Sequence, residues 1–258
     1  MAAVKPNLYN VKIEAYKTVM VSRSNRGGIR PRRAAGKSAP AATGRIRRAS
    51  RAETPYHHGA LRDALLEAAE RVLERDGLAG LTLRAVAREA GVSHAAPTHH
   101  FGDLTGLVSE LAAIGFRQFN AAMAAAGAAA GDTLIEKALA RAKAYVGYAQ
   151  AHPGMYGLMF RTERLDMSRP SLHEAAEASF AGLAEAIGAS RHEQIHERAL
   201  SLDQAAAIVR AWSLVHGFTM LLLDDRLSDV LHRLPEGTTA EMLLGAMLKA
   251  TILRPQGA

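Results

Sequence analysis

The chain has 258 residues, of which 48% are hydrophobic, and it contains no cysteine. This length allows one large or two modest domains with a sizeable core. The lack of cysteine excludes disulfides and thiolate metal sites and suits a reducing compartment. No secretory signal is recognisable, and the longest nearly apolar run, 211–223, is too short to span a bilayer. We therefore expect a cytoplasmic protein that does not enter a membrane.

The positive charge is concentrated at the N-terminus. Residues 1–53 carry 13 Lys and Arg against two acidic residues, whereas residues 54–258 have a net charge of −4. Such a segment lacks the apolar surface needed to offset its ordering entropy, so we expect 1–53 to be a disordered basic extension. It would contact phosphates or a minor groove, or be a plain flexible tail, or lie upstream of a true translation start near Met20 or later.

Beyond residue 53 the pattern becomes helical. Thr54 and Pro55 form an N-cap and a first-turn proline, and Gly77 ends the helix that follows. A second helix begins after Thr82 as its N-cap. Gly91 to Ser93 makes a tight turn, and Ser93 would cap a short third helix reaching about His100. The residues expected on the buried faces of the first two helices are Leu61, Leu65, Ala68, Ala69, Val72 and Leu73, then Leu83, Val86, Ala87 and Ala90.

The remaining chain also has helical periodicity and no convincing strand pattern. Phe101 is expected as an apolar plug and Asp103 as the cap of the next helix. The expected helices span 103–126, 132–152, 153–160, 168–187, 203–224 and 239–253, with a polar loop at 188–202. The segment 203–224 is apolar nearly all round, which predicts a fully buried helix. The fold class is therefore all-α.

Residues 82–101 contain the parts of a helix-turn-helix. A short apolar helix, a turn with glycine and a second helix with small or polar side chains occur in that order. Small side chains allow the backbone to approach base edges, and a proline ring or an alanine methyl can pack on a thymine methyl. Two amphipathic helices joined by a loop are the alternative, but that arrangement does not predict this combination of cap, glycine and exposed polar helix.

Residues 57–107 closely resemble the DNA-binding domain of the TetR/AcrR family of transcriptional repressors. The matching segments are LLEAAERVL (65–73), GLAGLTLRAVAREAGVS (77–93) and the His-Phe pair at 100–101. The resemblance implies that Thr82 and Arg84 meet phosphates. It places the other DNA-binding residues on and just before the recognition helix: Ser93, His94, Ala95, Pro97, Thr98, His99 and His100. Thr98 replaces the usual aromatic residue and Leu104 a usual lysine, so we expect weaker backbone contacts, which the basic extension would offset.

The second half resembles the WHG-type C-terminal domain of one branch of this family. The matching segments are AHPGMYGLMF (151–160) and AWSLVHGFTMLLL (211–223), which holds Trp212, His216 and Gly217. For Trp212 and Gly217 we favour simple packing, whereas His216 could bond a ligand. The resemblance implies that the last two long helices pair with those of a second copy. A pocket for an unidentified small effector would lie between the middle helices, lined by Met155, Met159, Phe160, Phe180, Trp212, His216 and Met220.

His192 to His196 matches the HExxH pattern of zinc proteases. Two histidines four apart on a helix bind zinc, with Glu193 as the base. The pattern stands in a polar, loop-like stretch without a sheet beside it, so a zinc-dependent hydrolase is only the alternative. We expect no metal site, no cofactor and no enzymatic activity.

The predicted organisation is a basic extension at 1–53, a three-helix DNA-binding domain at 54–102 and a helical ligand-binding and dimerisation domain at 103–258. The predicted function is that of a homodimeric regulator of transcription on palindromic double-stranded DNA. It would act as a repressor that a small apolar ligand releases.

Overall fold

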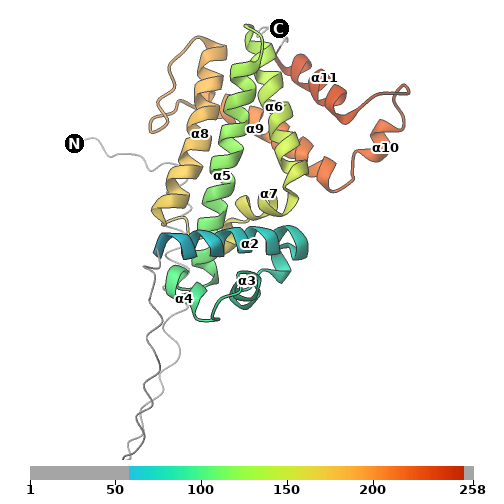
Figure 1. The fold of residues 1–258 in the computed structure, drawn as a ribbon. Helices are drawn as coiled ribbons and strands as arrows, with labels where there is room; N and C mark the ends of the chain where they lie inside the picture. Colours follow the sequence, from blue (N-terminus) through green and yellow to red (C-terminus); the bar gives the residue numbers. More distant parts are fainter. Residues whose placement is uncertain (1–57, 253–258) are drawn as a thin grey trace, which may run out of the picture. The chain divides into compact units, whose positions relative to one another are not determined.

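The computed structural model describes residues 58–252, and all of its regular secondary structure in that range is helical. Figure 1 shows the helices labelled in chain order. The all-α prediction is confirmed for this part of the chain. The basic extension at 1–53 and the predicted N-cap at Thr54 and Pro55 lie outside the described residues.

Three helices form the N-terminal part: α2 (His58–Gly80), α3 (Leu83–Glu89) and α4 (Ala96–Phe101). The predicted apolar face of α2 is buried, with Leu65, Val72 and Leu73 fully inaccessible. Gly77 has a φ of 66°, which interrupts the helical path inside α2 where the sequence predicts its end. One more turn then continues to Gly80, so the first helix extends three residues further than predicted.

The remaining helices form the body of the protein. They are α5 (Leu104–Ala129), α6 (Leu134–Ala151), α7 (Pro153–Met159), the short 3₁₀ helix η1 (Thr162–Arg164), α8 (Pro170–Arg191), α9 (Leu202–Leu223), α10 (Ser228–Leu231) and α11 (Ala240–Ile252). The long helix α5 packs mainly against α6 and α8, and α4 contacts its beginning (Figure 1). It therefore connects the short N-terminal helices with the body.

Capping groups fix several helix ends. Asp103 accepts a hydrogen bond from the backbone N–H of Gly106 at 2.8 Å, as predicted. At α6 the N-cap is Thr133, which forms a reciprocal capping box with Glu136, one residue later than the predicted start. At α8 the helix runs four residues beyond the predicted end and reaches Arg191. The short helix α10 was not predicted from the sequence.

Buried side chains form two clusters. The larger cluster joins α2, α3 and the end of α4 to α5, α6, α7 and the first half of α8. The smaller cluster holds Ala142, Val146, Phe218, Leu227 and Leu244, which come from α6, α9, α11 and the segment between α9 and α10. Because the first cluster is continuous, the N-terminal helices and the base of the body share one core.

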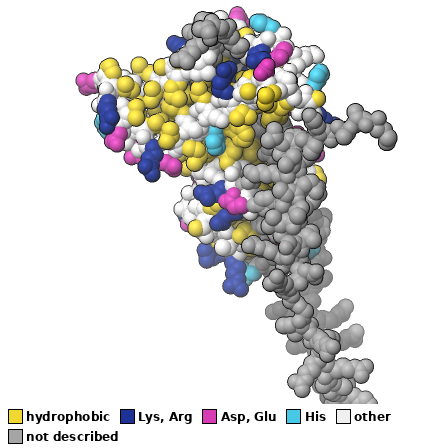
Figure 2. All heavy atoms as spheres, turned by 180° about the vertical axis from the view of Figure 1, so that it is seen from behind, with side chains coloured by type: hydrophobic (Ala, Val, Ile, Leu, Met, Phe, Trp, Pro, Cys, Tyr) yellow, Lys and Arg dark blue, Asp and Glu magenta, His cyan; other side chains and the backbone are white. Residues whose placement is uncertain are grey.

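The prediction that segment 203–224 is a fully buried helix is wrong for the single chain. Only Ala207, Ile208, Phe218 and Thr219 of α9 are buried. Leu202 is 85% exposed, Leu221 47% and Trp212 41%. Figure 2 shows hydrophobic side chains gathered over the face of the molecule opposite to the view of Figure 1. The apolar pattern of α9 therefore exceeds what residues 58–252 of one copy cover.

The run 211–223 is too short to span a bilayer, but it is only part of α9. The whole helix, Leu202–Leu223, is long and apolar enough to cross a membrane. A single helix of this kind is weak evidence, because a core helix of a soluble protein passes the same test.

Candidate DNA interface and ligand-binding body

The helix-turn-helix is formed by α3, the turn at 90–95 and α4. Thr82 caps α3 by accepting a hydrogen bond from the backbone N–H of Ala85 at 3.1 Å. Val86 and Ala87 are fully buried and hold α3 to the core. Gly91 has a φ of 66°, a conformation that favours glycine in the tight turn. The local sequence therefore sets both the start of α3 and the change of direction that follows it.

The start of α4 differs from the prediction. The helix begins at Ala96 with Ala95 as its N-cap, and no side chain caps it. Ser93 lies two residues earlier, and its hydroxyl accepts a hydrogen bond from the backbone N–H of Ala95 at 3.3 Å. Ser93 therefore stabilises the turn and not the end of α4, because residues 93–95 still belong to the turn and α4 begins only at Ala96.

Most of the predicted DNA-binding side chains are exposed. Thr82 and Arg84 are accessible at the start of α3, and the exposed group around α4 consists of Ser93, His94, Ala95, Thr98 and His99, with His100 partly buried. The ring centroids of His99 and His100 are 5.3 Å apart in an edge-to-face arrangement. We call these exposed, mostly polar positions on α3, the turn and α4 the polar strip.

Pro97 corrects the predicted set. Its side chain is buried, together with that of Phe101, so its ring packs inward and is not presented to a groove. The physical reason is its position in the first turn of a helix only six residues long. There the missing N–H costs nothing, and the side of the helix that carries Pro97 rests on the core.

Two arginines of α2 form ion pairs with a glutamate of α3. Arg71 and Arg75 of α2 both contact Glu89 of α3, at 3.0 and 2.8 Å. Hydrogen bonds from Arg75 and then Arg71 lower the pKa of the Glu89 carboxyl. Because Glu89 binds both arginines, their charges mainly stabilise the packing of α3 on α2 and are less available to bind an external ligand. Arg84 is exposed at the opposite end of α3.

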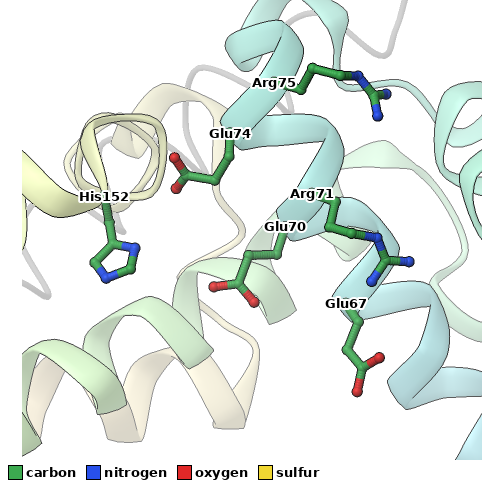
Figure 3. A pocket seen from close by; sticks show the side chains of 6 residues that line it. All are labelled: Glu67, Glu70, Arg71, Glu74, Arg75 and His152. Atoms are coloured by element: carbon green, nitrogen blue, oxygen red, sulfur yellow. The ribbon is translucent and has the colours of Figure 1, made fainter.

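An open hollow of about 660 Å³ lies beside α2. Its lining residues are Glu67, Glu70, Arg71, Glu74, Arg75 and His152 (Figure 3). In the close-up, Glu70 and Glu74 extend toward the side on which His152 lies, whereas the two arginines extend away from it. All of its lining residues have titratable side chains, and none of them belongs to the predicted apolar pocket.

The predicted pocket residues of the body fall into two groups. Met155 and Met159 of α7 are buried, and Phe160 and Phe180 are partly buried. Phe160 contacts the ring of His216, with the centroids 4.8 Å apart. These residues and His216 therefore lie in or beside the interior.

Trp212 and Met220 of α9 are each about 40% exposed, at 41% and 40%, and the ring of Trp212 also lies beside that of His216, with the centroids 6.2 Å apart. Both belong to the uncovered face of α9 in the single chain. A Cβ added at Gly217 would meet nothing within 4 Å, so none of the other helices in residues 58–252 packs closely against this glycine.

A polar group inside the body was not predicted. The hydroxyls of Tyr145 and Tyr156 lie 2.9 and 2.8 Å from Nδ1 of His216, and the two hydroxyls are 3.2 Å apart. Burial lowers the pKa of His216 and raises that of Tyr156 to about 12. The available signal was the position of the two tyrosines on the buried faces of α6 and α7, since buried tyrosine hydroxyls need a partner.

The HExxH match does not lie on a helix. His192 is the left-handed C-cap of α8, with a φ of 56°, and residues 193–196 continue outside a helix. The two histidines therefore do not share a helix face, and Glu193 pairs with Arg191. Within residues 58–252, no cluster of three or more metal-ligating side chains is found. The match arises from the helix end and its polar continuation.

Comparison with protein families gives two matches. Residues 65–111 match the model of bacterial regulatory proteins of the tetR family, and residues 138–247 match a tetracyclin repressor-like C-terminal domain. A comparison with curated protein sequences gives no significant match. The first match covers the helix-turn-helix and the second contains His216 and the exposed face of α9.

Solved structures show the same architecture. A protein of unknown function from Rhodococcus sp. RHA1 is 32% identical, with 78% of this chain and 97% of that chain covered and a TM-score of 0.62. The fatty acid degradation regulator FadR from Bacillus halodurans is 15% identical, with 79% and 100% covered and a TM-score of 0.53. The regulator PfmR from Thermus thermophilus is 18% identical, with 75% and 99% covered and a TM-score of 0.50. The last two similarities concern the fold alone.

The fold and the helix-turn-helix define a DNA-binding regulator of transcription. The chain belongs to the TetR family of transcriptional regulators. Members of this family are soluble, non-enzymatic DNA-binding proteins that typically dimerise and bind small molecules.

Proposed function

We propose that the protein is a cytoplasmic, homodimeric repressor that binds a palindromic operator and is released by a small apolar ligand. The observation that carries this proposal is the uncovered apolar face of α9 on a chain that also exposes the strip on α3 and α4. A two-fold dimer joined through one face presents two such strips, which is the arrangement that a palindrome requires.

The proposed dimer surface extends from α9 to α11. Its exposed apolar side chains are Val209, Trp212, Met220, Leu221, Met242 and Met247. Leu244 of α11 is buried against the smaller cluster, which fixes α11 beside α9. Apolar side chains of this number on two adjacent helices are typical of a protein-protein interface.

The proposed DNA contacts divide by their chemistry. Thr82 and Arg84 would contact phosphates, since one donates from a hydroxyl and the other from a guanidinium. His94, Ala95, Thr98 and His99 would face the major groove, with Ser93 and His100 at its edges. Histidine and threonine side chains offer donors and acceptors to base edges.

The proposed organisation assigns DNA binding to 54–102 and ligand binding and dimerisation to 103–258. Gly102, with a φ of 84°, and the N-cap Asp103 support a boundary between α4 and α5. For the ligand, the support is the aromatic and methionine-rich interior around Met155, Met159, Phe160 and His216. An apolar ligand with one hydrogen-bonding group fits this chemistry, since His216 and its tyrosine partners are polar groups in apolar surroundings.

The test is recovery of fragmented genomic DNA of the source organism by the purified full-length protein, followed by sequencing. We expect a few enriched fragments that share a palindrome, with half-sites about one helical turn apart. Uniform recovery that salt abolishes would contradict sequence-specific binding. Repeating the experiment with a variant lacking residues 1–53 separates recovery by the basic extension from recovery by α3 and α4.

A further inference from the structure

The last carbonyl of the proposed recognition helix is held by the body of the protein. Nη2 of Arg169 donates a hydrogen bond to the carbonyl oxygen of Phe101 at 3.1 Å. Phe101 is the final residue of α4, and Arg169 is the N-cap residue of α8, 68 positions later. Carbonyls at a helix C-terminus lack intrahelical partners, so this bond satisfies one of them.

A shared carboxylate connects this bond to α2. Glu110 of α5 lies 3.6 Å from Nη1 of Arg169, and its other oxygen accepts a hydrogen bond from Arg62 of α2 at 2.6 Å. The guanidinium of Arg62 also lies over the ring of Phe101, 5.5 Å from its centroid. Both arginines thus contact Phe101, one at its ring and one at its carbonyl, and Glu110 holds the two together. We call Arg62, Glu110 and Arg169 the Phe101 clamp.

The neighbouring residues make room for the clamp. A Cβ at Gly106 of α5 would collide with the carbonyl oxygen of Phe101 and with the guanidinium of Arg169. Only glycine allows Arg169 to pass α5 and reach α4 at this point. The side chain of Arg169 is only about one-third exposed, at 31%. Arginine is seldom buried without a partner, and here Glu110 is that partner.

The segment before α8 is anchored to α5 next to the clamp. The backbone N–H of Asp166 donates to the hydroxyl of the buried Ser109 at 2.8 Å, and Leu165 is buried in the larger cluster. Asp166 also lies 3.8 Å from Nε of Arg169. The connector between α7 and α8 and the clamp are therefore anchored at neighbouring residues of α5, Ser109 and Glu110.

The position of Arg169 is not explained by the stability of α8. A positive charge at a helix N-terminus opposes the helix dipole, and Arg169 makes no side-chain cap to its own helix. Its Nε atom is buried without a hydrogen-bond partner among the described residues. The interactions that compensate these costs are those with Phe101 and Glu110.

We infer that Arg169 is a positioning residue for DNA binding, which fixes the C-terminal end of α4 and transmits displacement of the α7–α8 connector to it. This inference rests on the proposed function, because it takes α4 as the recognition helix and the body as the ligand-responsive part. A connector that shifts by the length of one hydrogen bond releases the Phe101 carbonyl, and α4 then loses its hydrogen bond to the N-cap residue of α8.

The first test needs no DNA. Hydrogen exchange of peptides covering 94–102 is measured in the full-length wild type, in Arg169→Gln and in the matched control Arg164→Gln, an exposed arginine of the same connector. We expect faster exchange in 94–102 for Arg169→Gln, and unchanged exchange in α2 and in the second half of α5. The control should match the wild type. A merely structural role would accelerate exchange throughout the shared core.

The second test uses the palindromic fragment recovered with the wild type. Arg169→Gln should weaken its binding about three- to tenfold, which is a typical strength for such couplings. The dependence of affinity on salt should stay that of the wild type, because the variant removes no phosphate contact. A direct DNA contact at Arg169 would instead reduce the salt slope.

A second variant covers the case in which Arg169→Gln does not fold. Glu110→Gln keeps the shape of the side chain and removes the charge that holds both arginines, so it should give the same local increase in exchange. Wild-type exchange in 94–102 for the folded variants would overturn the inference, whether or not an operator is found. Failure to recover an operator alone would count against the proposed function and leave the exchange result decisive for the clamp.

Discussion

The hydroxyl of Tyr156 lies 2.8 Å from Nδ1 of His216, and this contact joins α7 to α9 inside the body. The Tyr145 hydroxyl reaches the same nitrogen from α6. One imidazole therefore connects three helices, including α9 of the proposed dimer surface. A change in this group affects both the interior of the body and the helix that carries the interface.

Stability should depend on pH through His216. Burial lowers its pKa in the folded state, whereas an unfolded chain has an ordinary value of about 6.5. As the pH falls through that value, the unfolded state binds more protons, so the stability present at higher pH is lost until the folded pKa is reached. His216→Gln cannot titrate, so its urea midpoint should fall less than that of the wild type between pH 7.5 and 5.5.

The control for this measurement is His232→Gln, since His232 is exposed and lies outside the tyrosine contacts. Its pH dependence should match the wild type. Equal pH dependence of His216→Gln and the wild type would show that the buried imidazole does not control acid stability.

Arg84 should contribute to DNA affinity through a phosphate. Arg84→Gln removes one charge from the exposed start of α3, so affinity should fall for every sequence alike. The slope of log affinity against log salt should become shallower by about one. The measurement is a titration of the recovered fragment at several salt concentrations, with Arg117→Gln on the exposed side of α5 as the matched control. An unchanged slope would place Arg84 away from the DNA backbone.

His99 and Pro97 should differ in their effects on sequence preference. His99 is exposed and Pro97 is buried. His99→Ala should relax discrimination at one operator position by about 1–3 kcal/mol, as expected for a lost base contact. Pro97→Ala should leave the preferred sequence unchanged, since its ring packs inward. Selection from a randomised DNA library compares the two variants, and a changed preference for Pro97→Ala would contradict the observed burial as the explanation.

The dimer should depend on the exposed face of α9. Leu221→Glu places a charge on a side chain that is 47% exposed in the single chain and buried in the proposed dimer. An unpaired buried charge costs about 3 kcal/mol or more, which corresponds to a hundredfold or greater loss of dimer affinity. Analytical ultracentrifugation should show monomers where the wild type is dimeric.

Leu134→Glu is the matched control for the dimer, because Leu134 has a similar exposure of 42% but lies at the start of α6, on neither α9 nor α11. It should remain dimeric. Monomers for both variants would indicate a general loss of stability, and dimers for both would place the interface elsewhere.

Deletion of residues 1–53 should weaken operator binding at low salt and reduce its salt dependence. The segment carries 13 of the 32 Lys and Arg, so its contribution would be mainly phosphate attraction. Thr98 and Leu104 stand where the family usually has phosphate-contacting residues, which makes such a contribution more important here. The measurement compares salt titrations of the two proteins on the recovered fragment. An identical slope would contradict the proposed role of the extension.

Much of the fold followed from local signals. The caps Thr82 and Asp103, the glycines at 77 and 91 and the proline at 153 set helix ends within a few residues, because each acts on the backbone next to it. The apolar face of α2 was predictable for the same reason, since helical periodicity depends only on spacing. The polar residues around α4 were also predictable as an exposed group, with Pro97 as the exception.

The helical pattern, the helix-turn-helix and the family could all be recognised from the order of the amino acids alone. Tertiary structure decided that Pro97 is buried, that α9 leaves one face uncovered and that HExxH falls across a helix end. It also brought Tyr145, Tyr156 and His216 together, and Arg169 to Phe101. These contacts join residues between 11 and 71 positions apart, and periodicity shows which face of a helix is apolar but not what covers it.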